Sequence, residues 1–251
     1  MKKVVWLLAL VFLLVGSLAQ AKLLGIKQYM GYPDIIYNNT GNIKYDPDGD
    51  INDDNVLDTV DIPILGVSEF QYNFVLDADD LKIAYSDDSN DVDYLSGDDY
   101  LTDMKVYLNV DTSGNLIEGY MVEQVVEGTV TVKNHTYSAG DVILAGEVVA
   151  FGYDKLYDSV NDVYVGGFDF LVSRDTLTGK LIDDDVWPDE YPVGLFAIAE
   201  EIGDWDGTFA SEFYLTKVKG DKAPVPEPAT MLLVGAGLLG IGFVGRRHLK
   251  K

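Results

Sequence analysis

Residues Val106–Leu116 read VYLNVDTSGNL, and this stretch decides the fold class of the central part of the chain. Its first five residues alternate between apolar side chains and side chains with a polar group, which is the two-residue period of a strand with one buried face. Asp111–Asn115 then has the composition of a hairpin turn, so residues 116–122 are expected to return as an antiparallel partner. The stretch therefore predicts a β-hairpin.

Similar patterns recur on both sides of this hairpin. Residues 70–76 place four large side chains on one face, and the acidic turn Asp77–Asp80 separates them from a second alternating segment at 81–85. Further strands are expected at 129–132, 142–151, 164–172, 194–199 and 209–218. No segment of this region has a helical period over ten or more residues. Many short strands joined by Asp, Asn and Gly turns predict an all-β domain, either an antiparallel β-sandwich or a barrel.

The most apolar of these strands is Val142–Phe151. A nearly continuous apolar run predicts a central strand that is covered on both faces. Gly146 interrupts the run and is expected to mark a bulge or a bend.

The first 21 residues have the three parts of a secretory signal peptide. Lys2 and Lys3 precede an apolar core at residues 4–18, and Ala19 and Ala21 are small residues two positions apart. This order is typical of a signal helix that is removed after export, so residues 1–21 are expected to be cleaved after Ala21. The alternative is an uncleaved anchor helix.

Residues 223–251 form a tail with three consecutive parts. A proline-rich entry keeps the chain extended, because proline restricts φ and lacks an N–H. Residues 229–245 carry no charge and predict a hydrophobic helix close to the minimum length for crossing a bilayer. A basic end follows, which is expected to stay cytoplasmic. The residues that define the tail are Pro226, Glu227, Pro228, Arg246 and Arg247.

From Val225 to Lys251 this tail resembles the PEP-CTERM signal, which exosortases read. The resemblance implies that the Pro-Glu-Pro residues serve recognition and take no part in catalysis. It also implies a signal peptidase and an exosortase-like enzyme as partners, with transient tethering to the inner membrane through the C-terminal helix. The final location would be the cell surface or extracellular matrix of a Gram-negative-type bacterium, usually one that makes exopolysaccharide. The alternative is a plain membrane anchor.

The region between the two ends, residues 22–222, has the size of one domain and contains no Pro/Gly/Ser-rich linker. The whole chain has 42 acidic and 18 basic residues and a formal net charge of −24. This charge repels nucleic acid and anionic lipid and attracts divalent or polybasic counterions. The chain has no cysteine, which excludes thiol catalysis and thiolate metal sites, and His135 is the single histidine of residues 22–222.

The densest acidic segment is Asp46–Asp58. Oxygen-bearing side chains at alternate positions resemble the calcium loops of EF-hands, dockerins and thrombospondin-type repeats, because calcium takes six to eight oxygen ligands. Two positions depart from the EF-hand, since Gly49 stands fourth and Leu57 stands where a bidentate acid belongs. The candidate calcium ligands are Asp46, Asp48, Asp50, Asn52, Asp54 and Asp58. The alternative is a solvated acidic loop.

Two tryptophans stand in apparent loops beside carboxylates. Exposed rings at Trp187 and Trp205 could stack on a sugar, whereas buried rings would cap the ends of the β core. His135 lies in a predicted hairpin turn, and no nucleophile elbow accompanies it. We therefore expect a non-enzymatic surface or biofilm-matrix protein. The alternatives are a carbohydrate-binding or adhesive module and, less favoured, a glycosidase with a carboxylate pair.

Overall fold

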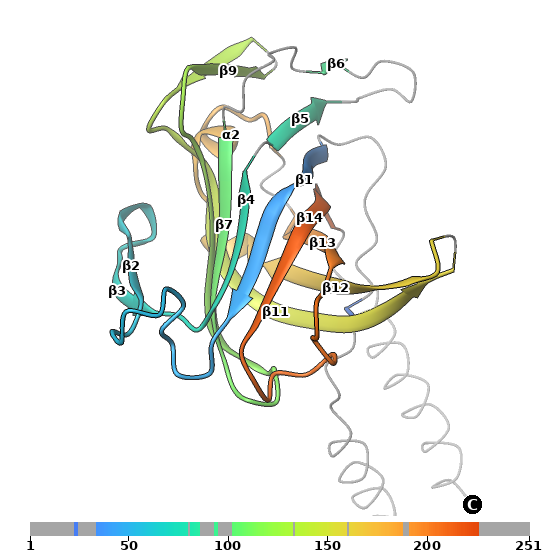
Figure 1. Cartoon of the computed structure of the whole chain (residues 1–251). Helices are drawn as coiled ribbons and strands as arrows, with labels where there is room; N and C mark the ends of the chain where they lie inside the picture. Colours follow the sequence, from blue (N-terminus) through green and yellow to red (C-terminus); the bar gives the residue numbers. More distant parts are fainter. Residues whose placement is uncertain are drawn as a thin grey trace, which may run out of the picture.

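The computed structural model describes residues 23–24, 34–79, 81–85, 93–94, 102–132, 134–159, 161–187 and 191–225 (Figure 1). The predicted signal peptide with its cleavage residues Ala19 and Ala21 lies outside the described residues. The Pro-Glu-Pro group, the hydrophobic helix 229–245 and the basic end lie outside them as well. Among the described residues there is no helix that is long and apolar enough to span a membrane.

Eight antiparallel strands form a closed barrel, in which each strand pairs with the next one along the chain (Figure 1). They are β1 (Asp34–Tyr45), β4 (Phe74–Asp79), β7 (Thr102–Val110), β8 (Leu116–Val125), β11 (Val142–Asp158), β12 (Val163–Val172), β13 (Val193–Glu201) and β14 (Phe213–Pro224). Pairing of β14 with β1, for example Tyr45 opposite Phe213, closes the ring. The predicted all-β class is confirmed, and of the two predicted architectures the barrel is the one observed.

Short elements are inserted between the barrel strands. The hairpin of β2 (Thr59–Ile62) and β3 (Val67–Gln71) stands beside the wall, and β5 (Leu81–Tyr85) continues the sheet along the far half of β1, with β6 (Asp93–Tyr94) at the edge. A second hairpin, β9 (Thr129–Val132) and β10 (His135–Ser138), lies at one end of the barrel (Figure 1). The short helical turns are η1 (Pro63–Leu65), η2 (Arg174–Thr176) and α2 (Lys180–Asp183).

The inner face of the barrel follows the alternation of the sequence. Along β7 every second residue, from Thr102 to Val110, is buried, while the residues between them are partly exposed. The predicted hairpin forms between β7 and β8, and Gly114 takes the positive φ of 77° that its turn requires. The Tyr153 ring packs so closely over Gly114 that no side chain would fit there. Aromatic rings fill the centre of the core, among them Phe74, Phe151, Phe168, Phe170 and Phe209.

Some strand predictions were wrong. Residues 70–76 are not one strand: β3 ends at Gln71, β4 begins at Phe74, and Phe70 belongs to the β2–β3 hairpin, opposite Val60. The expected turn at Asp77–Asp80 is also wrong: β4 continues to Asp79, and β5 runs on along β1 in the same direction, so the chain does not reverse between them. β1 and β2 were not predicted, because polar residues interrupt the alternation of β1 and because β2 is only four residues long.

The apolar strand β11 is longer than predicted, and residues 143–146 are buried on both faces. Thr178 exchanges backbone hydrogen bonds with Ala145, so the segment before α2 covers this part of the strand. Gly146 is not a bulge, because the register shifts lie between Val142 and Leu144 and between Val148 and Ala150. A side chain at Gly146 would instead collide with Val172, which explains the glycine by close packing.

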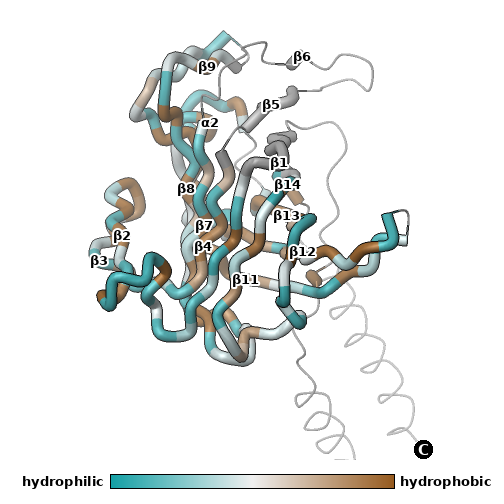
Figure 2. The backbone as a smooth tube through the Cα atoms, in the orientation of Figure 1, coloured by the Kyte–Doolittle hydropathy of each residue, from teal (hydrophilic) through white to brown (hydrophobic). Residues whose placement is uncertain are grey.

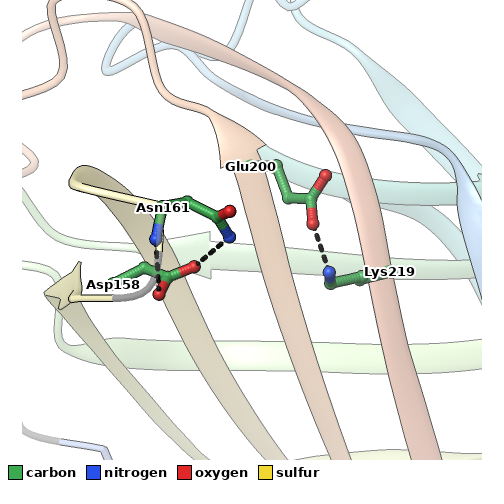
Figure 3. A network of polar contacts seen from close by, with 4 residues as sticks. All are labelled: Asp158, Asn161, Glu200 and Lys219. Carbon is green, nitrogen blue, oxygen red and sulfur yellow. Dashed lines mark hydrogen bonds and ion pairs between the residues drawn. The ribbon is translucent and has the colours of Figure 1, made fainter.

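Hydrogen bonds and ion pairs connect exposed side chains on the outer surface (Figure 3). In the β11–β12 hairpin, Asn161 Nδ2 donates to Asp158 Oδ2 at 2.7 Å. On the neighbouring strands β13 and β14, Lys219 Nζ donates to Glu200 Oε1, with side chains that are 48 % and 37 % exposed. Such exposed pairs contribute at most about 1 kcal/mol to stability.

Candidate functional site

The acidic loop Asp46–Asp58 leads from β1 to β2 and is mostly hydrophilic in Figure 2. Both of its ends are tied to the residues just before β4. The Asp46 N–H donates to the Asn73 carbonyl at 3.0 Å, and the Tyr72 N–H donates to the Asp58 carbonyl at 3.3 Å. The Asp58 N–H also donates to the Gly49 carbonyl at 2.8 Å, which closes the loop on itself.

Hydrogen bonds inside the loop involve the side chains at alternate positions. Asp50 accepts from the N–H groups of Asp54, at 2.9 Å, and Asn55, at 2.7 Å. Asn52 donates through Nδ2 to Asp58 Oδ1 at 3.0 Å, and the Asp58 carboxylate also accepts from the Asn52 N–H. The alternation seen in the sequence thus orients these side chains toward the loop backbone, which orders the loop through Asx-type turns.

A different set of carboxylates converges on one point. One oxygen from each of Asp46, Asp53 and Glu212 lies within 4.8 Å of the other two. Calcium–oxygen distances are about 2.3–2.6 Å, so oxygens with this spacing can share one calcium ion. Three carboxylates without a counterion repel one another, and a divalent cation would relieve that repulsion.

Of the six predicted ligands, only Asp46 belongs to this convergent group. Asp48 and Asp58 instead line a shallow pocket of about 130 Å³ together with Tyr72 and Asn73. Burial, aided by the Asp58 carboxylate, raises the pKa of Tyr72. Asp53 was missed because it stands between the alternating positions. Glu212 was missed because it lies in the β13–β14 loop, far away in the sequence, and nothing in its neighbourhood marks it as a ligand.

Both tryptophans are buried. Trp187 is 1 % and Trp205 is 5 % exposed. The Trp205 ring stacks on Phe168 with centroids 5.3 Å apart, and its Nε1 donates to the Thr208 carbonyl at 2.8 Å. A sugar stacks only on an exposed ring face, so the glycan-stacking prediction for these residues was wrong. Their large apolar area is used in the core, as the alternative interpretation held.

The predicted hairpin around His135 forms, although His135 is the first residue of β10 and does not lie in the turn. Its Nδ1 lies 3.5 Å from Asp184 Oδ2, which connects this hairpin to the segment after α2. Burial, with the nearby Asp184 carboxylate, raises the pKa of Tyr137. The contact joins two partly exposed side chains, and we read it as a structural link between the β9–β10 hairpin and the segment after α2.

The barrel runs directly into the tail. Pro224 is the last residue of β14, and Val225 is buried and donates its N–H to the Pro192 carbonyl at 2.9 Å. A folded domain followed without a linker by a proline-rich, apolar and basic-ended segment is the architecture of a passenger with an attached sorting signal. Residues 224–247 match the PEP-CTERM protein-sorting motif. The chain is therefore an exported protein that an exosortase-like system sorts. No curated protein and no solved structure matches it.

Proposed function

We propose that the barrel is a non-enzymatic component of the cell surface or extracellular matrix, delivered by exosortase-dependent sorting. The observation that carries this proposal is the continuity of barrel and signal: the motif begins at Pro224, inside the last strand. The sorted cargo is thus the barrel itself. The acidic surface, with a net charge of −24 for the chain, suits a hydrated matrix in which divalent cations bridge anionic polymers.

Calcium is the cation that this proposal includes. The oxygens of Asp46, Asp53 and Glu212 would provide ligands from the β1–β2 and β13–β14 loops, and backbone carbonyls or water would complete the shell. Binding would join two loops at the same end of the barrel, and this stabilises the folded state because the unfolded chain does not hold the three groups together.

Cell fractionation tests the delivery. In a bacterium with an exosortase, the unchanged protein is expected in the surface or matrix fraction. Replacing Pro226, Glu227 and Pro228 by Ala should leave the protein in the inner membrane. Glu127→Ala is the matched control, because it removes an exposed acid outside the tail. Equal distribution of the unchanged protein and the triple variant would refute the proposal.

A further inference from the structure

Two ionisable side chains meet inside the barrel. Lys222 of β14 and Glu123 of β8 are both 0 % exposed, and Lys222 Nζ donates to Glu123 Oε2. Around the barrel β8 is four strands away from β14 in either direction. The contact therefore crosses the lumen and joins opposite walls.

The residues directly opposite this pair on the neighbouring strands are apolar. Opposite Glu123 on the neighbouring strands stand Met104 and Leu144, and opposite Lys222 stands Leu195; all three are fully buried. Burial holds the pKa of Lys222 well below its usual value. Glu123 Oε1 has no hydrogen-bond partner among the described residues. Two full charges at this place would thus be poorly compensated for the loss of water.

We propose that Lys222 and Glu123 form an intramolecular isopeptide bond between Nζ and Cδ after folding. The lone pair of the neutral amine attacks Cδ of the protonated carboxyl group. The tetrahedral intermediate then loses the hydroxyl group, which leaves as water with a proton from the nitrogen. No electrons are exchanged with another molecule, and no further reactant is needed. The product has one N–H and one C=O in place of a whole amine and a whole carboxyl group, so fewer polar groups remain unsolvated in the apolar lumen.

A hydroxyl group on the neighbouring strand β7 suits the proton transfer in this reaction. Thr102 is buried on β7, opposite Val125, and is therefore the diagonal neighbour of Glu123 on the inner face. Its Oγ1 has no hydrogen-bond partner within the described part of the chain. A hydroxyl both donates and accepts, so it can carry a proton from the attacking nitrogen to the leaving oxygen.

The position of the bond fits a protein that is held by its tail. Lys222 lies two residues before the start of the sorting motif, so a pull on the tail would first strip β14 from its neighbours. A covalent connection from Lys222 to β8 would stop that stripping at once. Because the chain has no cysteine, a disulfide cannot provide this covalent connection.

Mass spectrometry of the purified full-length chain tests the proposal. The denatured chain should be lighter than its sequence by one water molecule. Trypsin should release a branched peptide that contains Glu123 and Lys222 and is not cut after Lys222. The exposed Glu200–Lys219 pair is the internal control, because it brings the same two residue types together in water and should give linear peptides only (Figure 3). A mass equal to the sequence, with normal cleavage after Lys222, would overturn the proposal.

Variants distinguish the formation of this bond from other reactions in which the chain loses water. Glu123→Ala and Lys222→Met should each restore the mass of the sequence, and Glu123→Gln should lose ammonia and reach the mass of the linked natural chain. Succinimide formation, for example at Asp48-Gly49, also loses water but does not depend on Glu123. A water loss that persists in Glu123→Ala would therefore contradict the proposal. Because the first measurement uses the natural chain, a variant that does not fold leaves the test intact.

Discussion

On the side of β4, where the strand pairing of β7 ends, the Asn73 side chain serves as the partner of Val110. Its Nδ2 donates to the Val110 carbonyl at 2.8 Å, and its Oδ1 accepts from the Val110 N–H at 2.9 Å. The backbone of Asn73 also accepts from Asp46 and donates to Leu108, both at 3.0 Å. One residue thus connects the end of β7, the start of β4 and the acidic loop.

Replacing Asn73 by Ala is expected to lower the free energy of unfolding by about 1–3 kcal/mol, because two partly buried backbone groups lose their partners. Urea denaturation followed by circular dichroism measures the change. Gln71→Ala is the control, since Gln71 is exposed and should change stability by less than about 0.5 kcal/mol. Equal effects of the two substitutions would refute this role of Asn73.

Replacing Trp205 by Ala is expected to cost about 3–5 kcal/mol, because it removes a large ring from the core beside Phe168. Thermal unfolding measures the loss, and Ile117→Ala, at a side chain that is 64 % exposed, is the control. An unchanged melting temperature in Trp205→Ala would show that the ring is not part of the core.

Calcium in large excess over its Kd is expected to raise the melting temperature. At 100 times Kd the gain is about 2.7 kcal/mol. Asp46→Ala and Glu212→Ala should each abolish the rise, whereas Asp183→Ala, which removes an exposed acid elsewhere, should keep it. Calorimetry without any heat of calcium binding at millimolar concentration would rule out the site.

Stability is expected to fall between pH 10 and pH 12. Burial raises the pKa of Tyr107 to about 12 in the folded chain, and the unfolded chain ionises its tyrosines near pH 10. Between these values the unfolded state has lost the proton that the folded state keeps, so the free energy of unfolding decreases as the pH rises. Below about pH 10 both states are protonated and this dependence disappears.

The Tyr107→Phe variant provides the check on this assignment. Urea denaturation at several alkaline pH values should give a smaller slope for the variant than for the natural chain. Tyr120, with its pKa also raised to about 12 by burial and by its contact with Glu118, should retain part of the slope. Identical slopes for variant and natural chain would exclude Tyr107 as the cause.

The sequence predicts those parts of the fold that depend on local pattern. The β7–β8 hairpin follows from alternation and a turn within twenty or so neighbouring residues, and β9 follows in the same way. Closure of the barrel depends on pairing between β1 and β14, at opposite ends of the domain. Residues 34–45 read DIIYNNTGNIKY, and the polar residues at their centre break the alternation that would predict a strand. The strand forms nevertheless, because its register with β14 shifts at this place.

The same distinction holds for the candidate site. Alternating acids identify the β1–β2 loop from composition alone, but the convergent group needs Glu212 from the β13–β14 loop. Glu123 and Lys222 look like ordinary surface residues in the sequence, and only barrel closure buries them against each other. Contacts between strands that are distant in the sequence depend on the topology of the barrel, and a local sequence pattern does not predict that topology.

The most direct test of the central claim, that this barrel is exosortase-sorted cargo, is the mass of the mature protein isolated from a bacterium with an exosortase. We predict a chain that starts at Lys22, ends close to Pro226–Pro228 and is recovered outside the inner membrane, without the apolar segment 229–245. A chain that still extends to Lys251 and stays in the inner membrane of such cells would contradict the account.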